Sequence, residues 1–186
     1  EEARLIYLGV ISGMSFDNQP YVLLDIGGGS TEIILADRTD AIALTSTRIG
    51  AVSLQKDFID DEPISEKRLD FLKTFIQGSL EPAVKKVCSR IRANEKPLFV
   101  ATSGTALAIG ALTSSEDKDL SFKKHGYKLS KEKLDNLLNK LLNISPEMRK
   151  KLPTLSDRRA EIIVPGALIM QTLMQMFKSE EITLSE

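Results

Sequence analysis

The sequence predicts an α/β fold with one mixed sheet and helices on both of its faces. Three short strand-like runs come first and are joined by brief turns, after which strands alternate with amphipathic helices. Strands joined by short turns pair antiparallel, whereas strands separated by a helix pair in parallel, and both kinds together give a mixed sheet. No repeat or linker-like stretch divides the 186 residues, so we expect a single domain over residues 1–186.

The first part of the chain carries the predicted antiparallel strands. Residues 21–26 (YVLLDI) and 32–36 (EIILA) are apolar runs separated by glycines, and residues 41–49 (AIALTSTRI) follow a turn at 37–40. The short links between these runs predict antiparallel pairing. Residues 3–12 precede them and show the apolar spacing of the end of an amphipathic helix.

Helical periodicity begins after residue 65. Apolar residues at three- and four-residue steps between Leu69 and Ile91 predict a long helix. Ser65 is its expected N-cap, and Pro82 can introduce a kink. Residues 97–102 then predict a buried strand.

The last part of the chain continues the alternation of helices and strands. Residues 106–112 are expected to be helical, and Ser130 is expected to cap a further helix with a leucine-rich face. Ser156 is expected to cap the last helix, which we predict to be interrupted at Pro165-Gly166. Residues 181–184 (EITL) predict one more strand.

Composition and charge narrow the functional classes. The formal net charge of −1 lacks the basic excess of a nucleic-acid-binding protein, so we expect no nucleic-acid partner. No apolar run approaches the ~20 residues of a membrane span, so we expect no membrane partner. The single cysteine, Cys88, fits a reducing, cytoplasmic location, and we expect it to be a buried core residue. The single histidine, His125, excludes a metal site built on histidines.

The strongest functional feature is the segment Asp25-Ile26-Gly27-Gly28-Gly29-Ser30-Thr31-Glu32, at the end of a predicted strand. Three glycines let the backbone turn tightly and approach a ligand, and successive amides in such a turn can bind an anion. Ser30 and Thr31 add hydroxyl donors, while Asp25 and Glu32 supply the hard oxygen ligands that Mg²⁺ prefers. The alternative is a plain hairpin turn with an incidental acid on each side. We favour phosphate binding because a second such loop lies downstream.

That second loop is Ala101-Thr102-Ser103-Gly104-Thr105, between a predicted strand and a predicted helix. The free amides at a helix start, together with the Ser and Thr hydroxyls, can bind an anion. Taken alone, the same residues fit an ordinary helix N-cap equally well. The basic pair Arg158-Arg159 is expected to be an ordinary pair of helix-end charges.

Four segments resemble, in order, the exopolyphosphatase/guanosine pentaphosphate phosphatase (Ppx/GppA) family. Residues 1–7 (EEARLIY) resemble the segment that enters the second lobe in that family. Residues 25–32 resemble its second phosphate loop, 102–105 (TSGT) its later loop, and 159–167 (RAEIIVPGA) its late helix. The resemblance covers nearly the whole chain, and four motifs in order make it specific.

The resemblance implies an actin-like ATPase fold, in which two ribonuclease H-like lobes enclose the active site. This chain would be the second lobe, with residues 1–12 in the helix between the lobes. The family removes terminal phosphate from inorganic polyphosphate, or the 5′ γ-phosphate from guanosine pentaphosphate, usually with Mg²⁺. Either molecule is therefore the expected substrate, and the sequence does not choose between them.

The resemblance also implies roles for single residues. Glu2 aligns with the family's glutamate that activates the attacking water. Asp25 and Glu32 align with the carboxylates that organise the metal and the water. The residues that we expect to bind phosphate, from both loops, are Gly27, Gly28, Gly29, Ser30, Thr31, Ser103, Gly104 and Thr105.

The chain departs from the family pattern in what it lacks. The family's first phosphate loop, an Asp-x-Gly-Ser-type turn in the first lobe, is absent, and the chain opens without Met. We therefore expect a fragment whose partner is the first lobe of the same protein, and which has little phosphatase activity alone. The family often dimerises, which leaves a homodimer open as well.

Two other functional classes stay open. A non-catalytic module of the same fold would bind a guanosine polyphosphate or a nucleotide, and binding by the full-length protein without turnover would identify it. The chain would otherwise be the nucleotide-binding lobe of another actin-like protein, such as a sugar kinase or a filament former. Failure to bind ATP would argue against that class, as does the segment Glu1-Glu2-Ala3-Arg4.

We predict that Glu2→Gln in the full-length protein lowers turnover of both polyphosphate and guanosine pentaphosphate. Glutamine keeps the shape of the side chain but cannot take a proton from water, and a general base typically contributes ~10²–10⁴-fold to a rate. The measurement is steady-state phosphate release by wild type and variant on each substrate. An unchanged rate would remove the catalytic role from Glu2.

Overall fold

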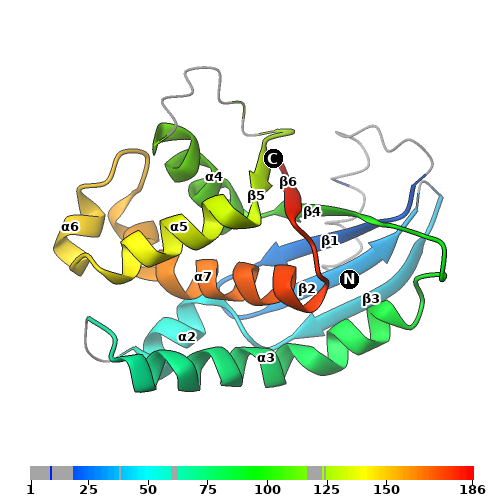
Figure 1. Cartoon of the computed structure of the whole chain (residues 1–186), viewed down its shortest axis with the longest axis horizontal. Coiled ribbons are helices and arrows are strands. Elements are labelled where there is room, and N and C mark those ends of the chain that lie inside the picture. Colours follow the sequence, from blue (N-terminus) through cyan, green and yellow to red (C-terminus); the bar gives the residue numbers. More distant parts are fainter. Residues whose placement is uncertain (1–8, 10–18, 38, 60–62, 117–122, 124) are drawn as a thin grey trace.

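A mixed sheet of six strands forms the centre of the protein (Figure 1). The computed structural model describes residues 9, 19–37, 39–59, 63–116, 123 and 125–186. The strands are β1 (Tyr21–Ile26), β2 (Thr31–Ala36), β3 (Ala41–Thr47), β4 (Leu98–Thr102), β5 (Lys128–Ser130) and β6 (Glu181–Ser185). Their order in the sheet is β3-β2-β1-β4-β6-β5. The pairs β1–β4 and β4–β6 are parallel and the others antiparallel, so the predicted mixed sheet is confirmed.

The described helices begin at residues that can cap them. They are α2 (Ala51–Phe58), α3 (Glu66–Cys88), α4 (Gly104–Glu116), α5 (Lys131–Leu142), α6 (Pro146–Lys150) and α7 (Asp157–Met176). The predicted caps Ser65 and Ser130 accept hydrogen bonds from the third amides of α3 and α5. Ser156 is the N-cap of α7 but its side chain makes no capping bond. A bilayer-spanning helix is not found in the described part of the chain.

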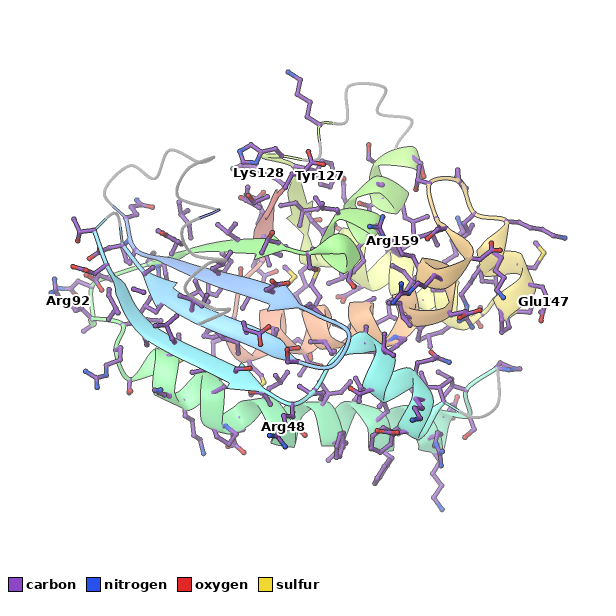
Figure 2. The ribbon with its side chains drawn as sticks, turned by 180° about the vertical axis from the view of Figure 1, so that it is seen from behind. Arg48, Arg92, Tyr127, Lys128, Glu147 and Arg159 are labelled. Carbon is purple, nitrogen blue, oxygen red and sulfur yellow. The ribbon has the colours of Figure 1, made fainter. Side chains whose placement is uncertain are left out.

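Helices α3 and α7 lie side by side on one face of strands β1 to β3 (Figures 1 and 2). Val22, Leu24 and Ile26 of β1 point to this face and belong to one hydrophobic cluster with Ile76 of α3 and Leu168 of α7. All five side chains are at most 1% exposed. Burial of this cluster supplies the main driving force for folding.

The opposite face of the central strands is also shielded from solvent. Tyr21, Leu23 and Ile34 alternate with the cluster residues along β1 and β2, and each is 0% exposed. Strands buried on both faces need apolar residues at successive positions, which explains why β1 and β2 appear in the sequence as unbroken apolar runs.

The structure contains elements that were not predicted from the sequence. Helices α2 and α6 and strand β5 are absent from the predicted elements, although Ala51, Leu54 and Phe58 of α2 have helical spacing. Helix α3 continues through Pro82, and α7 continues through Pro165-Gly166, so the predicted interruption of α7 is wrong. A proline removes one backbone hydrogen bond, and in α7 the packing of its buried face on neighbouring helices outweighs that loss. The predicted helix over residues 3–12 lies outside the described residues, apart from Gly9.

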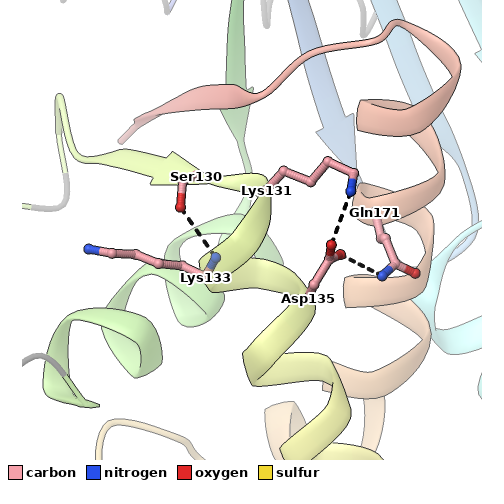
Figure 3. A network of polar contacts seen from close by, with 5 residues as sticks. All are labelled: Ser130, Lys131, Lys133, Asp135 and Gln171. Atoms are coloured by element: carbon pink, nitrogen blue, oxygen red, sulfur yellow. Dashed lines mark hydrogen bonds and ion pairs between the residues drawn. The ribbon is translucent and has the colours of Figure 1, made fainter.

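A polar network joins α5 to α7 beside their apolar contact (Figure 3). Asp135 of α5 accepts a hydrogen bond from Nε2 of Gln171 at 2.7 Å and another from Nζ of Lys131 at 3.1 Å. The ion pair compensates the charge of Asp135 where that side chain is only 30% exposed. The apolar side of the same contact is filled by the buried leucines Leu134, Leu137, Leu138 and Leu141.

Helices α4 and α7 approach closely where Gly166 faces Thr105. A Cβ atom on Gly166 would lie 2.3 Å from Cγ2 of Thr105, far inside van der Waals contact. Thr105 is the second residue of α4, so the missing side chain at Gly166 sets how close the start of α4 comes to α7.

We predict that Gly166→Ala lowers the free energy of unfolding, whereas Gly78→Ala raises it. Inside a helix alanine is favoured over glycine by ~0.5–1 kcal/mol, and a Cβ on Gly78 meets nothing within 4 Å. At Gly166 the clash with Thr105 should exceed this gain, because overpacking costs ~1–3 kcal/mol. Urea unfolding measures both values. Thr105→Ser removes the clashing methyl and should restore the stability of Gly166→Ala, and a failure to restore it would show that this contact is not the cause.

Candidate functional site

Three amides of the glycine-rich turn between β1 and β2 have no acceptor among the described residues. The amide of Gly27 donates to the carbonyl of Ser30 at 2.9 Å, which closes the turn and consumes that donor. Among the described residues, none accepts a hydrogen bond from the amides of Gly28, Gly29 or Ser30. Gly28 and Gly29 are exposed to solvent. These three amides can therefore donate to an anion.

The second loop follows β4 and opens α4. Strand β4 lies parallel to β1, with Thr102 opposite Asp25, so both loops leave the same end of the sheet. Ser103 has a φ of 122°, a conformation that residues with a side chain rarely adopt and that costs ~1–3 kcal/mol. Its Oγ accepts a hydrogen bond from the amide of Ala106 at 3.2 Å. Strain of this kind is typical of functional loops.

These two loops and the start of α7 line one cleft of about 440 Å³. Gly27 and Gly28 contribute from the turn, and Ser103, Gly104 and Thr105 from the second loop. The other lining residues are Ile26, Val52, Ser156, Arg158, Arg159 and Ile162. The starts of α2, α4 and α7 lie at this end of the sheet, on the left in Figure 1. The positive ends of three helix dipoles therefore border the cleft.

Arg159 of α7 lies beside the start of α4 (Figure 2). Its Nη2 lies 2.9 Å from the position that a Cβ on Gly104 would occupy, so the glycine makes room for the guanidinium group. Neither Arg158 nor Arg159 forms an ion pair or a side-chain hydrogen bond with the described residues. Cations in the first turn of a helix oppose its dipole. The prediction of ordinary helix-end charges is therefore corrected: both arginines line the cleft.

Asp25 and Glu32 lie opposite each other on β1 and β2. Side chains alternate along a strand, so both carboxylates occupy the face opposite the one to which Ile26 points. Opposite residues in an antiparallel pair have Cα atoms ~4.5–5.5 Å apart, which lets two carboxylates share one site. Glu32 is 4% exposed, and its Oε1 accepts a hydrogen bond from Oγ of Ser46 at 2.7 Å. Neither acid is among the residues that line the cleft.

Asp25 and Glu32 lie outside the cleft lining but form a pair of carboxylates next to the glycine-rich turn that could hold a metal ion. No group of three or more His, Cys, Asp and Glu side chains suited to a metal occurs in the ranges that the structure describes. A pair of carboxylates is nevertheless a common arrangement for Mg²⁺, which is often held by one or two carboxylates, with waters and phosphate oxygens completing its shell.

The structure brings five of the eight predicted phosphate-binding residues to the cleft, and the other three lie outside its lining. Gly29 is exposed in the turn and Ser30 is partly buried beside it. Thr31 is 0% exposed, and its hydroxyl donates to the carbonyl of Ile49 at 2.7 Å. That hydroxyl is therefore not available to a ligand, which corrects its predicted role as a donor. Glu2 lies outside the described residues.

Two parts of the site were not predicted from the sequence, helix α2 and the arginines of α7. The signal for α2 is the helical spacing of its apolar residues directly after Gly50. The signal for the arginines is their position one and two residues after the acidic first position of α7, where the helix dipole disfavours cations. A cation at such a position indicates a function other than helix stabilisation.

Cys88 and His125 lie apart from the cleft lining. Cys88 is exposed, so the prediction of a buried core residue is wrong. The buried face of α3 at this end is made by Val84 and Val87, and Cys88 follows Val87 onto the solvent side. His125 is exposed, with Nδ1 3.5 Å from the hydroxyl of Ser185.

Comparison with known proteins indicates a phosphatase family, in agreement with the loops and arginines that line the cleft. The chain matches the model of the Ppx/GppA phosphatase family over residues 1–186. It is 25% identical over 190 residues to exopolyphosphatase 2 of Mycobacterium tuberculosis. The aligned region covers 100% of this chain and 58% of that protein. A guanosine-5′-triphosphate,3′-diphosphate pyrophosphatase of Photobacterium profundum is 36% identical over 86 residues, or 46% of this chain and 17% of that protein. The chain thus spans 58% of the length of the mycobacterial relative.

Solved structures agree on the fold. A crystal structure of an exopolyphosphatase from Cytophaga hutchinsonii has a TM-score of 0.88 at 22% identity and covers 99% of this chain and 58% of that chain. The Aquifex aeolicus member of the Ppx/GppA family has a TM-score of 0.84 at 23% identity, over 100% of this chain and 57% of that chain. These neighbours have the actin-like ATPase, ribonuclease H-like fold, which confirms the predicted fold class. Since the family model matches the chain along its whole length, the chain belongs to the Ppx/GppA phosphatase family.

Proposed function

We propose that this chain is part of a phosphohydrolase that releases terminal phosphate from inorganic polyphosphate or from guanosine pentaphosphate. The observation that carries the proposal is a single cleft lined by Gly28, by the start of α4 and by two arginines without ion-pair partners in the described chain. These groups offer N–H donors and positive charge, which suit a chain of phosphates. The names of the mycobacterial exopolyphosphatase and the Photobacterium pyrophosphatase support the same chemistry.

The reaction would transfer a phosphoryl group to water. The water oxygen attacks the terminal phosphorus, the bridging P–O bond breaks, and a proton of the water passes to a carboxylate, for which Glu2 is the proposed base. The amides of Gly28, Gly29 and Ser30 would donate to the oxygens of the terminal phosphoryl group. Donors that are fixed before the reaction stabilise the developing charge without reorganising, so positioning would supply much of the rate.

Asp25 and Glu32 would hold a Mg²⁺ ion, which neutralises phosphate charge when bound. The burial of Glu32 supports this assignment, because its carboxylate makes no ion pair with a described residue and has one hydrogen bond, from Ser46. A buried carboxylate without a counter-ion is costly, and a cation shared with Asp25 would remove that cost.

The cleft lining suits the chain of phosphates that both candidate substrates share. Arg158, Arg159 and Ser103 offer what phosphate oxygens bind. An arginine guanidinium can also stack on a base or donate to the O6 and N7 edge of guanine. The two arginines therefore fit inorganic polyphosphate and guanosine pentaphosphate alike.

The curated and structural relatives are longer than this chain, and we propose that the remaining length supplies the other wall of the active site. A first phosphate loop from that part would face the turn at Gly28 and enclose the terminal phosphate. Residues 1–186 alone would then hold the phosphate chain on one side only, which leaves little catalytic activity.

Phosphate release by the full-length protein tests the proposed function. The full-length protein and residues 1–186 are assayed on long-chain polyphosphate and on guanosine pentaphosphate, with Mg²⁺ and with a chelator. We expect metal-dependent release by the full-length protein on at least one of the two substrates, and little by residues 1–186. No release from either substrate would refute the function, and metal-dependent release by residues 1–186 would refute the need for a second wall.

We predict that Arg159→Ala in the full-length protein raises KM for polyphosphate by ~10–100-fold, because a charge-assisted hydrogen bond contributes ~1.5–3 kcal/mol. The change in kcat should be smaller, since Arg159 lies at the start of α4 and not at the turn that would hold the reacting phosphate. Arg159→Lys keeps the charge without the planar fork and should give an intermediate KM. Steady-state kinetics at two salt concentrations measures both constants.

Arg92→Ala is the matched control for Arg159→Ala. The Arg92 side chain is 86% exposed and lies outside the cleft lining, so its loss should leave KM unchanged. Equal KM values for Arg159→Ala and Arg92→Ala would remove the assigned role from Arg159.

A further inference from the structure

Helix α2 begins against the glycine-rich turn and binds two of its carbonyls. The amide of Ala51 donates to the carbonyl of Gly27 at 3.0 Å. The amides of Val52 and Ser53 donate to the carbonyl of Gly28 at 2.8 Å and 3.1 Å. The first amides of a helix have no acceptor within the helix, so the turn serves as the cap of α2.

These hydrogen bonds decide which way the amides of the turn face. In a trans peptide unit the C=O of one residue and the N–H of the next point in opposite directions. Because the carbonyls of Gly27 and Gly28 face α2, the amides of Gly28 and Gly29 face away from it. Rotation of either peptide unit would present a carbonyl oxygen to a bound phosphate and replace attraction by repulsion.

Gly50 allows α2 to come this close to the turn. A Cβ on Gly50 would lie 2.5 Å from both the carbonyl carbon and the oxygen of Gly28, and 2.6 Å from the nitrogen of Gly29. The backbone of Gly50 is extended, with φ −149° and ψ 170°, which any residue can adopt. Glycine is therefore required at position 50 because there is no room for a side chain, and not because of the backbone conformation. The atoms in the way are backbone atoms of the turn itself, so any side chain must displace the turn or the helix.

Thr31 ties the other end of the turn to the residue before Gly50. Its buried hydroxyl donates to the carbonyl of Ile49 at 2.7 Å. Thr31 directly follows Ser30, the last residue of the turn, and it is the first residue of β2. The chain on both sides of the turn is thus fixed to the segment that leads into α2.

We propose that Gly50, Thr31 and the first turn of α2 are a positioning device for the glycine-rich turn. By holding the carbonyls of Gly27 and Gly28, α2 would keep the amides of Gly28 and Gly29 directed at the terminal phosphate. This inference rests on the proposed function, because it takes the turn as the phosphate site. Gly50 and Thr31 act only through the turn and do not contact the substrate.

Steady-state kinetics of the full-length protein tests Gly50 first. We expect Gly50→Ala to lower kcat on polyphosphate by ~100-fold, the order of loss when one preorganised donor is removed. KM should rise by only ~10-fold, as for the loss of one hydrogen bond to a charged group, because the arginines of the cleft still bind the rest of the phosphate chain. Gly78→Ala is the matched control, since a Cβ there meets nothing within 4 Å, and it should keep wild-type constants. Wild-type kcat in Gly50→Ala would overturn the inference.

Calorimetry with inorganic pyrophosphate separates a misplaced turn from a poorly folded protein. An irreversibly misfolded fraction lowers the number of binding sites per chain and leaves the Kd of the folded molecules unchanged, whereas a misplaced turn raises Kd. Urea unfolding of Gly50→Ala checks that the folded state is fully populated, because a reversible unfolding equilibrium would also raise the apparent Kd. We expect a Kd at least ~10-fold higher in Gly50→Ala, as for the loss of one hydrogen bond to a charged group. Fewer sites with an unchanged Kd would make Gly50 a structural residue only and would overturn the inference.

A pair of Thr31 variants gives a test that does not depend on Gly50→Ala. Thr31→Val keeps the shape of the side chain and removes the hydroxyl, whereas Thr31→Ser keeps the hydroxyl. We expect a raised Kd for pyrophosphate and a lowered kcat in Thr31→Val, and near wild-type values in Thr31→Ser. Equal values in the two variants would overturn the role of Thr31. A wild-type protein that binds pyrophosphate but hydrolyses neither substrate would refute only the proposed function, and the Kd values would still decide this inference.

Discussion

The hydrogen bonds from the first amides of α2 to the carbonyls of Gly27 and Gly28 are the constraint on which the cleft depends. They satisfy a helix start that would otherwise carry unpaired donors. They also order a run of three glycines, the residues that lose the most conformational freedom on folding. Without them the turn would present its amides in many directions. The contacts that complete the start of α2 therefore also order the turn whose amides we propose to bind phosphate.

The parallel pairing of β1 with β4 supplies the second requirement, because it brings two loops that are far apart in the sequence to one end of the sheet. Ligands of open α/β sheets bind at this end, where the chain leaves parallel strands for helices. The close contact of Gly166 with Thr105 then fixes α7 against α4 and sets Arg159 over Gly104. Strand pairing, helix packing and two glycines without room for a side chain thus define the cleft together.

Local patterns suffice for much of this fold. The apolar run of a strand and the serine that caps a helix can each be recognised within a few residues. The sequence alone therefore predicts β1, β2, α3 and α5. Helix α2 is different, because its first amides are satisfied by a turn that precedes β2 in the chain. The roles of Arg159 and Thr31 are equally non-local: one depends on the space left by Gly104, the other on the carbonyl of Ile49. The sequence shows that Ser30 and Thr31 both carry a hydroxyl group. It does not show that the hydroxyl of Thr31 is the one that becomes buried.

A phosphate site built from peptide groups responds to mutation differently from one built from side chains. No substitution other than proline removes a backbone N–H, so the donors of the turn persist through almost any single change that leaves its shape intact. Under the proposed function, discrimination among phosphate compounds would change at the positions of the cleft that carry side chains, among them Ser103, Arg158 and Arg159. Under the proposed function, the amides that hold the terminal phosphate would stay constant while substrate preference diverges.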